Sequence, residues 1–107
     1  MEGGFITGIG AVLEAELGYY DLPSKRYAWK KFSNTQEIVS LTGSISTSEN
    51  KLNLHAHIVL SDEHYQAHGG HLKEATVGGT CEILLRRFDT KLQRQYDKET
   101  GLNLLDL

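Results

Sequence analysis

Residues 52–60, LNLHAHIVL, alternate between two kinds of side chain, and this pattern constrains the fold more than any other stretch. Successive side chains of a β-strand point to opposite faces, so a period of two predicts a strand with two different faces. One face would carry Leu52, Leu54, Ala56, Ile58 and Leu60; the other would carry Asn53, His55, His57 and Val59. We therefore expect an amphipathic strand that buries the first face and displays polar chemistry on the second.

The rest of the chain also reads as short segments rich in β-branched and aromatic residues, separated by glycines and polar turns. We expect strands at 5–12, 13–20, 26–32, 37–46, 71–78 and 80–88, with turns at 21–25 and 47–51. Residues 97–101 are predicted to form the turn of a C-terminal hairpin with Gly101 left-handed. Phe88, Leu92 and Tyr96 are also spaced as on a helix, the competing interpretation. With 107 residues, the chain suggests one mostly antiparallel β domain spanning 1–107.

Charge and cysteine content narrow the classes of function. The chain has 11 basic and 14 acidic residues, a net charge of -3, which argues against nucleic-acid binding through a basic face. The single cysteine, Cys81, allows no internal disulfide, fits a reducing compartment, and is expected to be buried and inert. No signal-peptide pattern and no apolar run of about 20 residues occurs, so we expect a cytoplasmic protein without a membrane span.

All five histidines lie between residues 55 and 71. His55 and His57, two apart on a strand, would point to the same side. The polar segment 61–70 is predicted as a hairpin loop centred on His64, and a symmetric antiparallel register then places His57 opposite His71. His55, His57 and His71 would converge on one face, and three histidines with an open position are typical of catalytic zinc.

Other interpretations of the histidines stay open. They could be surface residues on an exposed sheet face, and a register slip of one residue would turn His71 away. His64 and His68 are expected in the solvent-exposed loop, with His68 as a substitute ligand if the register differs. A pH sensor is a further alternative, because free histidines gain charge between pH 5 and 8.

Partner groups for such a site are harder to place. Glu37 and Glu82 lie on predicted strands and are candidates for orienting an imidazole. Arg86 and Arg87 are candidates for anchoring a substrate, but only strand alternation suggests them. That pair and Lys30-Lys31 are equally well explained as surface residues of ordinary strands.

Six segments, GIGAV, LGYYD, EIVSLTGSIS, LHAHIVLSDE, GGHL and TVGGTCEI, occur here in an order that resembles the PPC (plants and prokaryotes conserved) domain family. The resemblance covers almost the whole chain from Gly3. It implies an α/β (α+β) fold on a mostly antiparallel sheet, assembled as a homotrimer. In stand-alone prokaryotic members, the histidines that match His55, His57 and His71 resemble a Zn²⁺ site. The fold is also similar to that of acetolactate decarboxylase, whose zinc is held by three histidines.

The resemblance implies three functions. The first is a regulatory or ligand-binding protein with a small-molecule ligand at the metal; the second is a zinc-dependent lyase or decarboxylase-like enzyme. The third, DNA binding, is a family label from plant members that also carry AT-hooks, and this sequence has no R-G-R-P core. Members usually have a strand, a glycine turn and a helix before GIGAV. Here Met1 lies just upstream, so we expect an uncovered sheet face that self-association or a partner chain covers.

Overall fold

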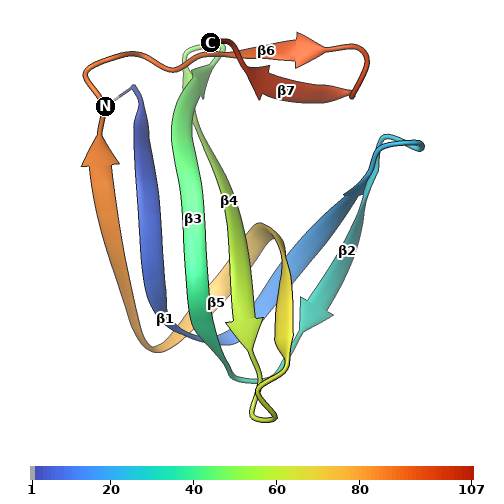
Figure 1. Ribbon diagram of the computed structural model, residues 1–107, viewed down its shortest axis with the longest axis vertical. Helices are drawn as coiled ribbons and strands as arrows, with labels where there is room; N and C mark the ends of the chain where they lie inside the picture. The colour runs from blue at the N-terminus through green and yellow to red at the C-terminus, as the bar shows by residue number, and fades with distance from the viewer. Residues whose placement is uncertain (1) are drawn as a thin grey trace.

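The computed structural model describes residues 2–107, which form seven β-strands and no helix (Figure 1). None of these residues therefore forms a helix that could cross a membrane. The strands are β1 (Gly4–Asp21), β2 (Arg26–Phe32), β3 (Gln36–Ser48), β4 (Lys51–Ser61), β5 (Ala67–Arg87), β6 (Arg94–Asp97) and β7 (Leu102–Leu105). All strand pairs between them are antiparallel, which confirms the strand-dominated antiparallel fold.

Two strands are longer than the sequence predicts. Segments 5–12 and 13–20 join into β1, and 71–78 and 80–88 join into β5, so the prediction of separate strands was wrong. Glycines that suggested breaks instead let the strands bend, as at Gly79, whose φ is 80°, and at the irregular pairing between Gly8 and Gly10. A Cβ on Gly10 would lie 2.3 Å from the carbonyl oxygen of Thr80. A larger residue at position 10 would therefore prevent β1 and β5 from approaching each other this closely.

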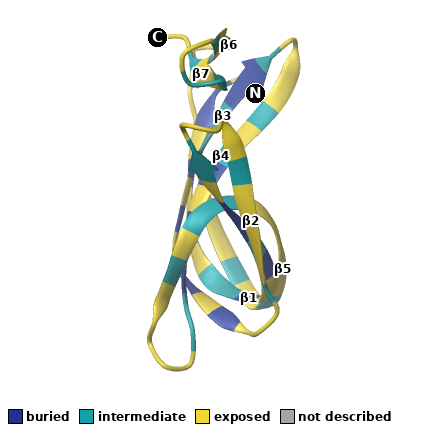
Figure 2. Cartoon of the chain, turned by 90° about the vertical axis from the view of Figure 1, so that its right-hand side faces the viewer, coloured by how far each residue is buried: buried dark blue, intermediate teal, exposed yellow. Residues whose placement is uncertain are grey.

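The long strands close the sheet on itself. β1 pairs with β2, β3 and β5, while β5 also pairs with β4, so β1, β3, β4 and β5 form a ring. Figures 1 and 2 show β1 and β5 curling together around one end of the molecule, with β2 at the edge. The predicted C-terminal hairpin is confirmed as β6 and β7, with Gly101 at φ 77°. This hairpin is tied to the end of β3 by a hydrogen bond from the Thr47 amide to the Leu92 carbonyl, 2.6 Å.

The core is small and lies inside the closed part of the sheet. Its buried members are all aliphatic: Ile6, Val12, Ala15, Leu17, Ile38, Leu41, Ala56, Ile58 and Leu60. β4 contributes three of the five residues of its predicted apolar face, because Leu52 and Leu54 are 65% and 57% exposed. Near the start of β1, Leu85 is paired with the buried Ile6 and is still 49% exposed. Large apolar side chains of the sheet thus remain exposed beside buried core residues.

Candidate metal centre

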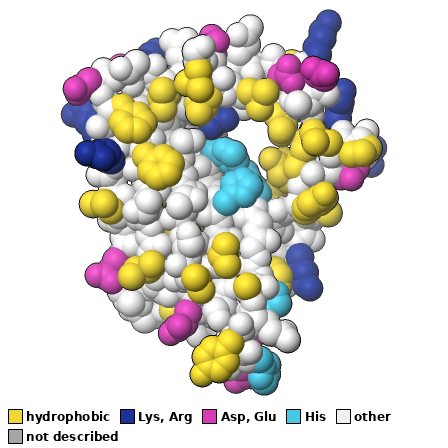
Figure 3. All heavy atoms as spheres, in the orientation of Figure 1, with side chains coloured by type: hydrophobic (Ala, Val, Ile, Leu, Met, Phe, Trp, Pro, Cys, Tyr) yellow, Lys and Arg dark blue, Asp and Glu magenta, His cyan; other side chains and the backbone are white. Residues whose placement is uncertain are grey.

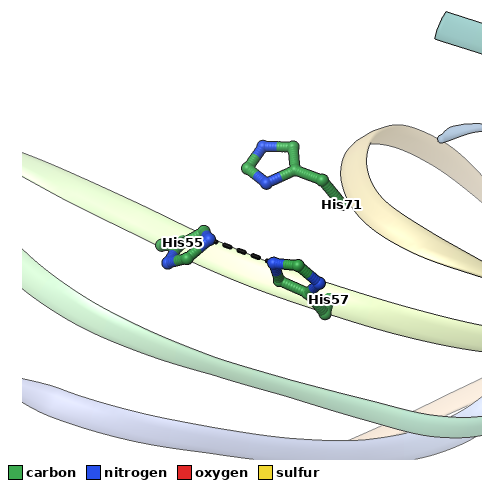
Figure 4. Close-up of side chains that lie close together, drawn as sticks. All are labelled: His55, His57 and His71. Atoms are coloured by element: carbon green, nitrogen blue, oxygen red, sulfur yellow. Dashed lines mark hydrogen bonds between the residues drawn. The ribbon is translucent and has the colours of Figure 1, made fainter. Parts of the chain in front are cut away.

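Two neighbouring strands bring three histidines together. His55 and His57 lie on β4, and His71 lies near the start of β5. The pairing of β4 with β5 places His57 directly opposite His71, which is the register that the sequence predicts. Figure 4 shows the three imidazoles turned toward a common space, and their potential ligand atoms all lie within 4.8 Å of one another.

The spacing of these nitrogens suits one metal ion. The Nε2 atoms of His55 and His57 are 3.2 Å apart. Two nitrogens bound at 2.0–2.1 Å in a tetrahedron would be separated by ~3.3 Å. The His71 ring is 5.2 Å from the His55 ring and 5.6 Å from the His57 ring, between centroids. His55 and His57 already have the spacing of a chelating pair, and a ligand atom of His71 lies within 4.8 Å of theirs.

An aromatic cluster holds the third histidine in place. His71 is paired with Gly18 of β1 as well as with His57, and Gly18 is paired in turn with Trp29 of β2. Because Gly18 has no side chain, the Trp29 ring lies over this position, 5.9 Å from the His71 ring. Tyr27 stacks on Trp29 at 4.7 Å and lies 5.2 Å from His71. These rings limit the orientations open to the His71 imidazole.

The local environment lowers the pKa of two of the clustered histidines, His55 and His71. Desolvation lowers the pKa of His55, and the neighbouring His57, Arg94 and His71 lower it further. Desolvation also lowers the pKa of His71, with a further contribution from His57. A metal ion binds the neutral imidazole, so proton competition is reduced in this arrangement. Donor type, spacing and the lowered pKa of His55 and His71 therefore fit a bound Zn²⁺, and the ligand role of the three residues stays a prediction.

The two other histidines lie apart from this cluster. His64 is in the loop between β4 and β5, with its side chain 75% exposed, as expected. His68 was expected in the same loop, but it belongs to β5 and its Nε2 lies 3.0 Å from Oδ2 of Asp62. The loop is shorter than predicted because Asp62 closes it, accepting hydrogen bonds from the amides of His64 and Gln66.

The acidic and basic partners suggested by the sequence lie elsewhere. Glu37 is paired with Ser61, and Glu82 with Ile9, and neither carboxylate contacts a histidine. Arg86 and Arg87 are exposed beside the beginning of β1. Cys81 is only partly buried, so full burial was not correct. Alternation along one strand cannot show which distant segment reaches the site.

The basic residue near the histidines is Arg94 on β6, which the sequence analysis missed. Arg94 donates from Nε to Oγ of Ser46 at 2.7 Å and from Nη2 to Oγ of Ser44 at 3.3 Å. Ser44 lies directly opposite His55 in the β3–β4 pair, so the guanidinium lies over the histidine face. No sequence signal indicates this position, because the hairpin reaches the site only through tertiary contacts.

A pocket adjoins the histidines on the side of Arg94. It has a volume of about 340 Å³, within the size range of small-molecule sites. Figure 3 shows the central histidine surface at the edge of an opening, with basic surface beside it. The pocket lies between β2, β4, β5 and the β6–β7 hairpin. Its lining residues are Tyr27, Asn53, Leu54, His55, His71, Arg94, Gly101, Leu102, Asn103 and Leu104.

Known structures share this fold over the whole described chain. A metal-containing protein from Archaeoglobus fulgidus is 34% identical, with a TM-score of 0.93, covering 100% of this chain and 76% of the other. A structure from Bacteroides thetaiotaomicron, named as a candidate DNA-binding protein, is 36% identical with a TM-score of 0.94, covering 97% and 73%. The chain thus spans about three quarters of each of these proteins.

A further solved structure and a family profile point to one protein family. A plant- and prokaryote-conserved protein from Pyrococcus horikoshii is 31% identical with a TM-score of 0.91, covering 100% of this chain and 74% of the other. The search of curated proteins gave no match. The profile of the Plants and Prokaryotes Conserved domain matches residues 1–89, which include all three clustered histidines. The chain therefore belongs to the Plants and Prokaryotes Conserved (PPC) domain family.

Proposed function

We propose that this protein binds one Zn²⁺ through His55, His57 and His71 and uses the site to hold a small-molecule ligand. The observation that carries the proposal is the convergence of three imidazoles from two paired strands, with ligand atoms within 4.8 Å of one another. A tetrahedral ion with three protein ligands keeps one position for a further ligand. A regulatory or ligand-binding role follows from that position and from the adjoining pocket.

The donor set favours zinc over the common hard cations. Mg²⁺ and Ca²⁺ prefer oxygen ligands, whereas the cluster offers three imidazole nitrogens and no carboxylate. Imidazole suits zinc, copper, nickel and iron, and geometry and availability decide among them. The related Archaeoglobus fulgidus protein is named as metal-containing, which supports a metal without naming the element.

We further propose that the protein works as a homotrimer in the cytoplasm. Large apolar side chains remain exposed on the sheet, including Leu54, Ile83 and Leu85 at 57%, 54% and 49%. Exposed apolar surface of this kind on a small domain is typical of a protein interface. Copies of the same chain are the simplest partner, because closed homo-oligomers are the usual soluble assemblies.

A second candidate function is a zinc-dependent lyase or decarboxylase-like enzyme. The observation in its favour is the pocket of about 340 Å³ that joins the histidines to Arg94. When bound, zinc would supply Lewis-acid polarisation of a substrate oxygen. In this chain the histidines would position the ion, and the pocket walls would orient the substrate. Turnover of small keto acids by zinc-loaded protein would distinguish an enzyme from a binding protein.

We do not extend the DNA-binding description of the Bacteroides relative to this chain. The net charge is -3, whereas a protein that coats DNA needs many phosphate-neutralising lysines and arginines. The adjacent basic pairs, Lys30-Lys31 and Arg86-Arg87, lie on β2 and β5, on different strands.

Replacing one histidine tests the metal site. We expect His57→Ala to lose the metal, because removal of a direct ligand costs more than the 10–100-fold in affinity typical of outer partners. Elemental analysis of the purified wild type should find about one zinc per chain and almost none in the variant. His64→Ala is the matched control, since it removes an exposed loop histidine and should retain the metal.

Trp29 provides an independent optical measurement. It is the only tryptophan and its ring lies 5.9 Å from that of His71. Binding of Co²⁺, which absorbs and quenches nearby indole emission, should therefore reduce Trp29 fluorescence in the wild type and in His64→Ala. Equal quenching in His57→Ala, or a wild type without metal, would contradict the proposal.

A further inference from the structure

Arg94 is held in a fixed orientation above the histidine face. Its Nε donates to Ser46, its Nη2 to Ser44, and its Nη1 to the carbonyl of Asn103 at 2.8 Å. Ser44 and Ser46 belong to β3, and Asn103 belongs to β7. An arginine fixed from two separate sheets has lost most of its side-chain freedom, so binding a ligand there costs little further ordering.

The guanidinium retains unused hydrogen-bonding capacity and charge. A guanidinium has five N–H groups, and these contacts use three of them. No ion pair within residues 2–107 joins Arg94 to a carboxylate. Two N–H groups and an uncompensated positive charge are thus available to an anion.

The pocket beside Arg94 suits a small anion with an apolar body. No aspartate or glutamate is among the described residues that line it, so no carboxylate would repel an anion. Asn53 and Asn103 add polar groups, while Tyr27 and Leu102 provide apolar walls. The volume, about 340 Å³, lies at the low end for ligand pockets, which favours a molecule of few heavy atoms.

We propose that Arg94 anchors the carboxylate of a small ligand whose other end reaches the histidine cluster. Arginine binds carboxylates through paired N–H···O bonds that are charge-assisted and directional. His55 and Arg94 line the same pocket, so one short molecule can contact both. The proposal rests on the proposed function for the metal end of the ligand, but the arginine end can be tested without metal.

Calorimetric titration with pyruvate tests the anchor, with uncharged pyruvamide as the matched probe. We expect pyruvate to bind zinc-loaded protein at least about tenfold more tightly than pyruvamide, the factor expected for a charge-assisted bond. Arg94→Gln should weaken pyruvate binding by a similar factor while its zinc content stays at the wild-type level. Arg87→Gln, an exposed arginine at the far end of β5, should bind as the wild type.

Arg94 also ties the C-terminal hairpin to β3, so thermal unfolding of each variant is measured first. If Arg94→Gln does not fold, Arg94→Lys is tested in its place. Lysine keeps the positive charge but lacks the planar guanidinium fork, so this variant should bind pyruvate several-fold more weakly than the wild type. Wild-type affinity in a folded Arg94 variant, or no preference for pyruvate over pyruvamide, would overturn the proposal.

The same titration separates the anchor from the metal. A wild type that binds no zinc would overturn the proposed function alone. Arg94-dependent pyruvate binding to that metal-free protein would still support the anchor, and its absence would overturn the anchor as well.

Discussion

Gly18 occupies the point where the histidine site and the aromatic cluster meet. A Cβ at this position would lie 2.4 Å from Cζ3 of Trp29, closer than packed atoms allow. The ring of Trp29 in turn lies edge-on to His71. Glycine is therefore required here because the Trp29 ring approaches closely, and not because of the backbone conformation. It matters for the histidine site as well as for the sheet.

Gly18→Ala should destabilise the protein and disturb the site. Overpacking of this kind costs about 1–3 kcal/mol in the free energy of unfolding. Because Trp29 must move, its fluorescence spectrum should change and metal affinity should fall. Urea unfolding followed by Trp29 emission measures the free energy of unfolding and the spectrum, and a Co²⁺ titration measures the metal affinity. Gly69→Ala is the milder comparison, since its new Cβ would approach the nearest atom, the Ile58 carbonyl oxygen, only to 3.2 Å. Equal effects from the two changes would contradict the assignment.

At the scale of elements, the β6–β7 hairpin carries Arg94 and Asn103 to the pocket, and its turn depends on Asp97. Oδ2 of Asp97 accepts hydrogen bonds from the hydroxyl of Thr100 at 2.7 Å and from its amide at 2.9 Å. Tyr20 and Lys25 hold the outer end of the hairpin through the carbonyls of Thr100 and Lys98. The hairpin therefore bridges the tip of β1–β2 and the end of β3.

Acid should loosen this turn. The side-chain hydrogen bond from Thr100 lowers the pKa of Asp97, the Thr100 amide and the charge of Lys25 lower it further, and desolvation opposes them. A folded pKa below the unfolded value of about 3.9 gives stability that is present above that pH and lost as the pH falls further. The Gly101 amide bonds the Asp97 carbonyl, so its protection against hydrogen exchange, taken relative to the intrinsic rate at each pH, should fall below about pH 4.

Asp97→Asn should weaken the pH dependence of Gly101 protection, because the titrating group is gone. Asp106→Asn, near the C-terminus and outside the turn, is the control and should keep the wild-type profile. An unchanged profile in Asp97→Asn would show that another carboxylate governs the turn.

The β4–β5 hairpin shows how far local sequence reaches at this scale. The alternation in 52–60 and the polar loop were enough to predict the pairing of His57 with His71. The same reasoning divided β1 and β5 into two strands each, because it treated glycines as strand ends. In the folded chain, each of these strands continues past its glycines because it is paired with neighbouring strands on both sides.

For the whole molecule, exposed apolar surface is the feature that most needs a partner. Leu54 on β4 and Leu85 on β5 continue the apolar face of the buried core residues Ala56 and Ile6, and both are about half exposed. Burying apolar surface contributes about 25 cal/mol per Å², so leaving such a face in water is costly. A homotrimer that covers it would be larger than the 12.0 kDa chain by a factor of three.

Charging this face should break the assembly. We expect Leu54→Asp with Leu85→Asp to shift the sedimenting mass from about three chains toward one, because each carboxylate would be buried without a partner. Tyr65→Asp is the control: this loop residue is 92% exposed and lies away from the apolar face. A wild type that sediments as a stable monomer would contradict the proposed trimer.

The sequence by itself determined the antiparallel strand character, the C-terminal hairpin and the three histidines of the cluster. These features depend on side-chain alternation and short turns, which act between residues close in the chain. Only the tertiary structure decided the continuity of β1 and β5, the position of Arg94 over the histidine face, and which leucines of β4 are buried. Those depend on packing between segments far apart in sequence, where the space available and the neighbours that fill it are properties of the folded chain as a whole.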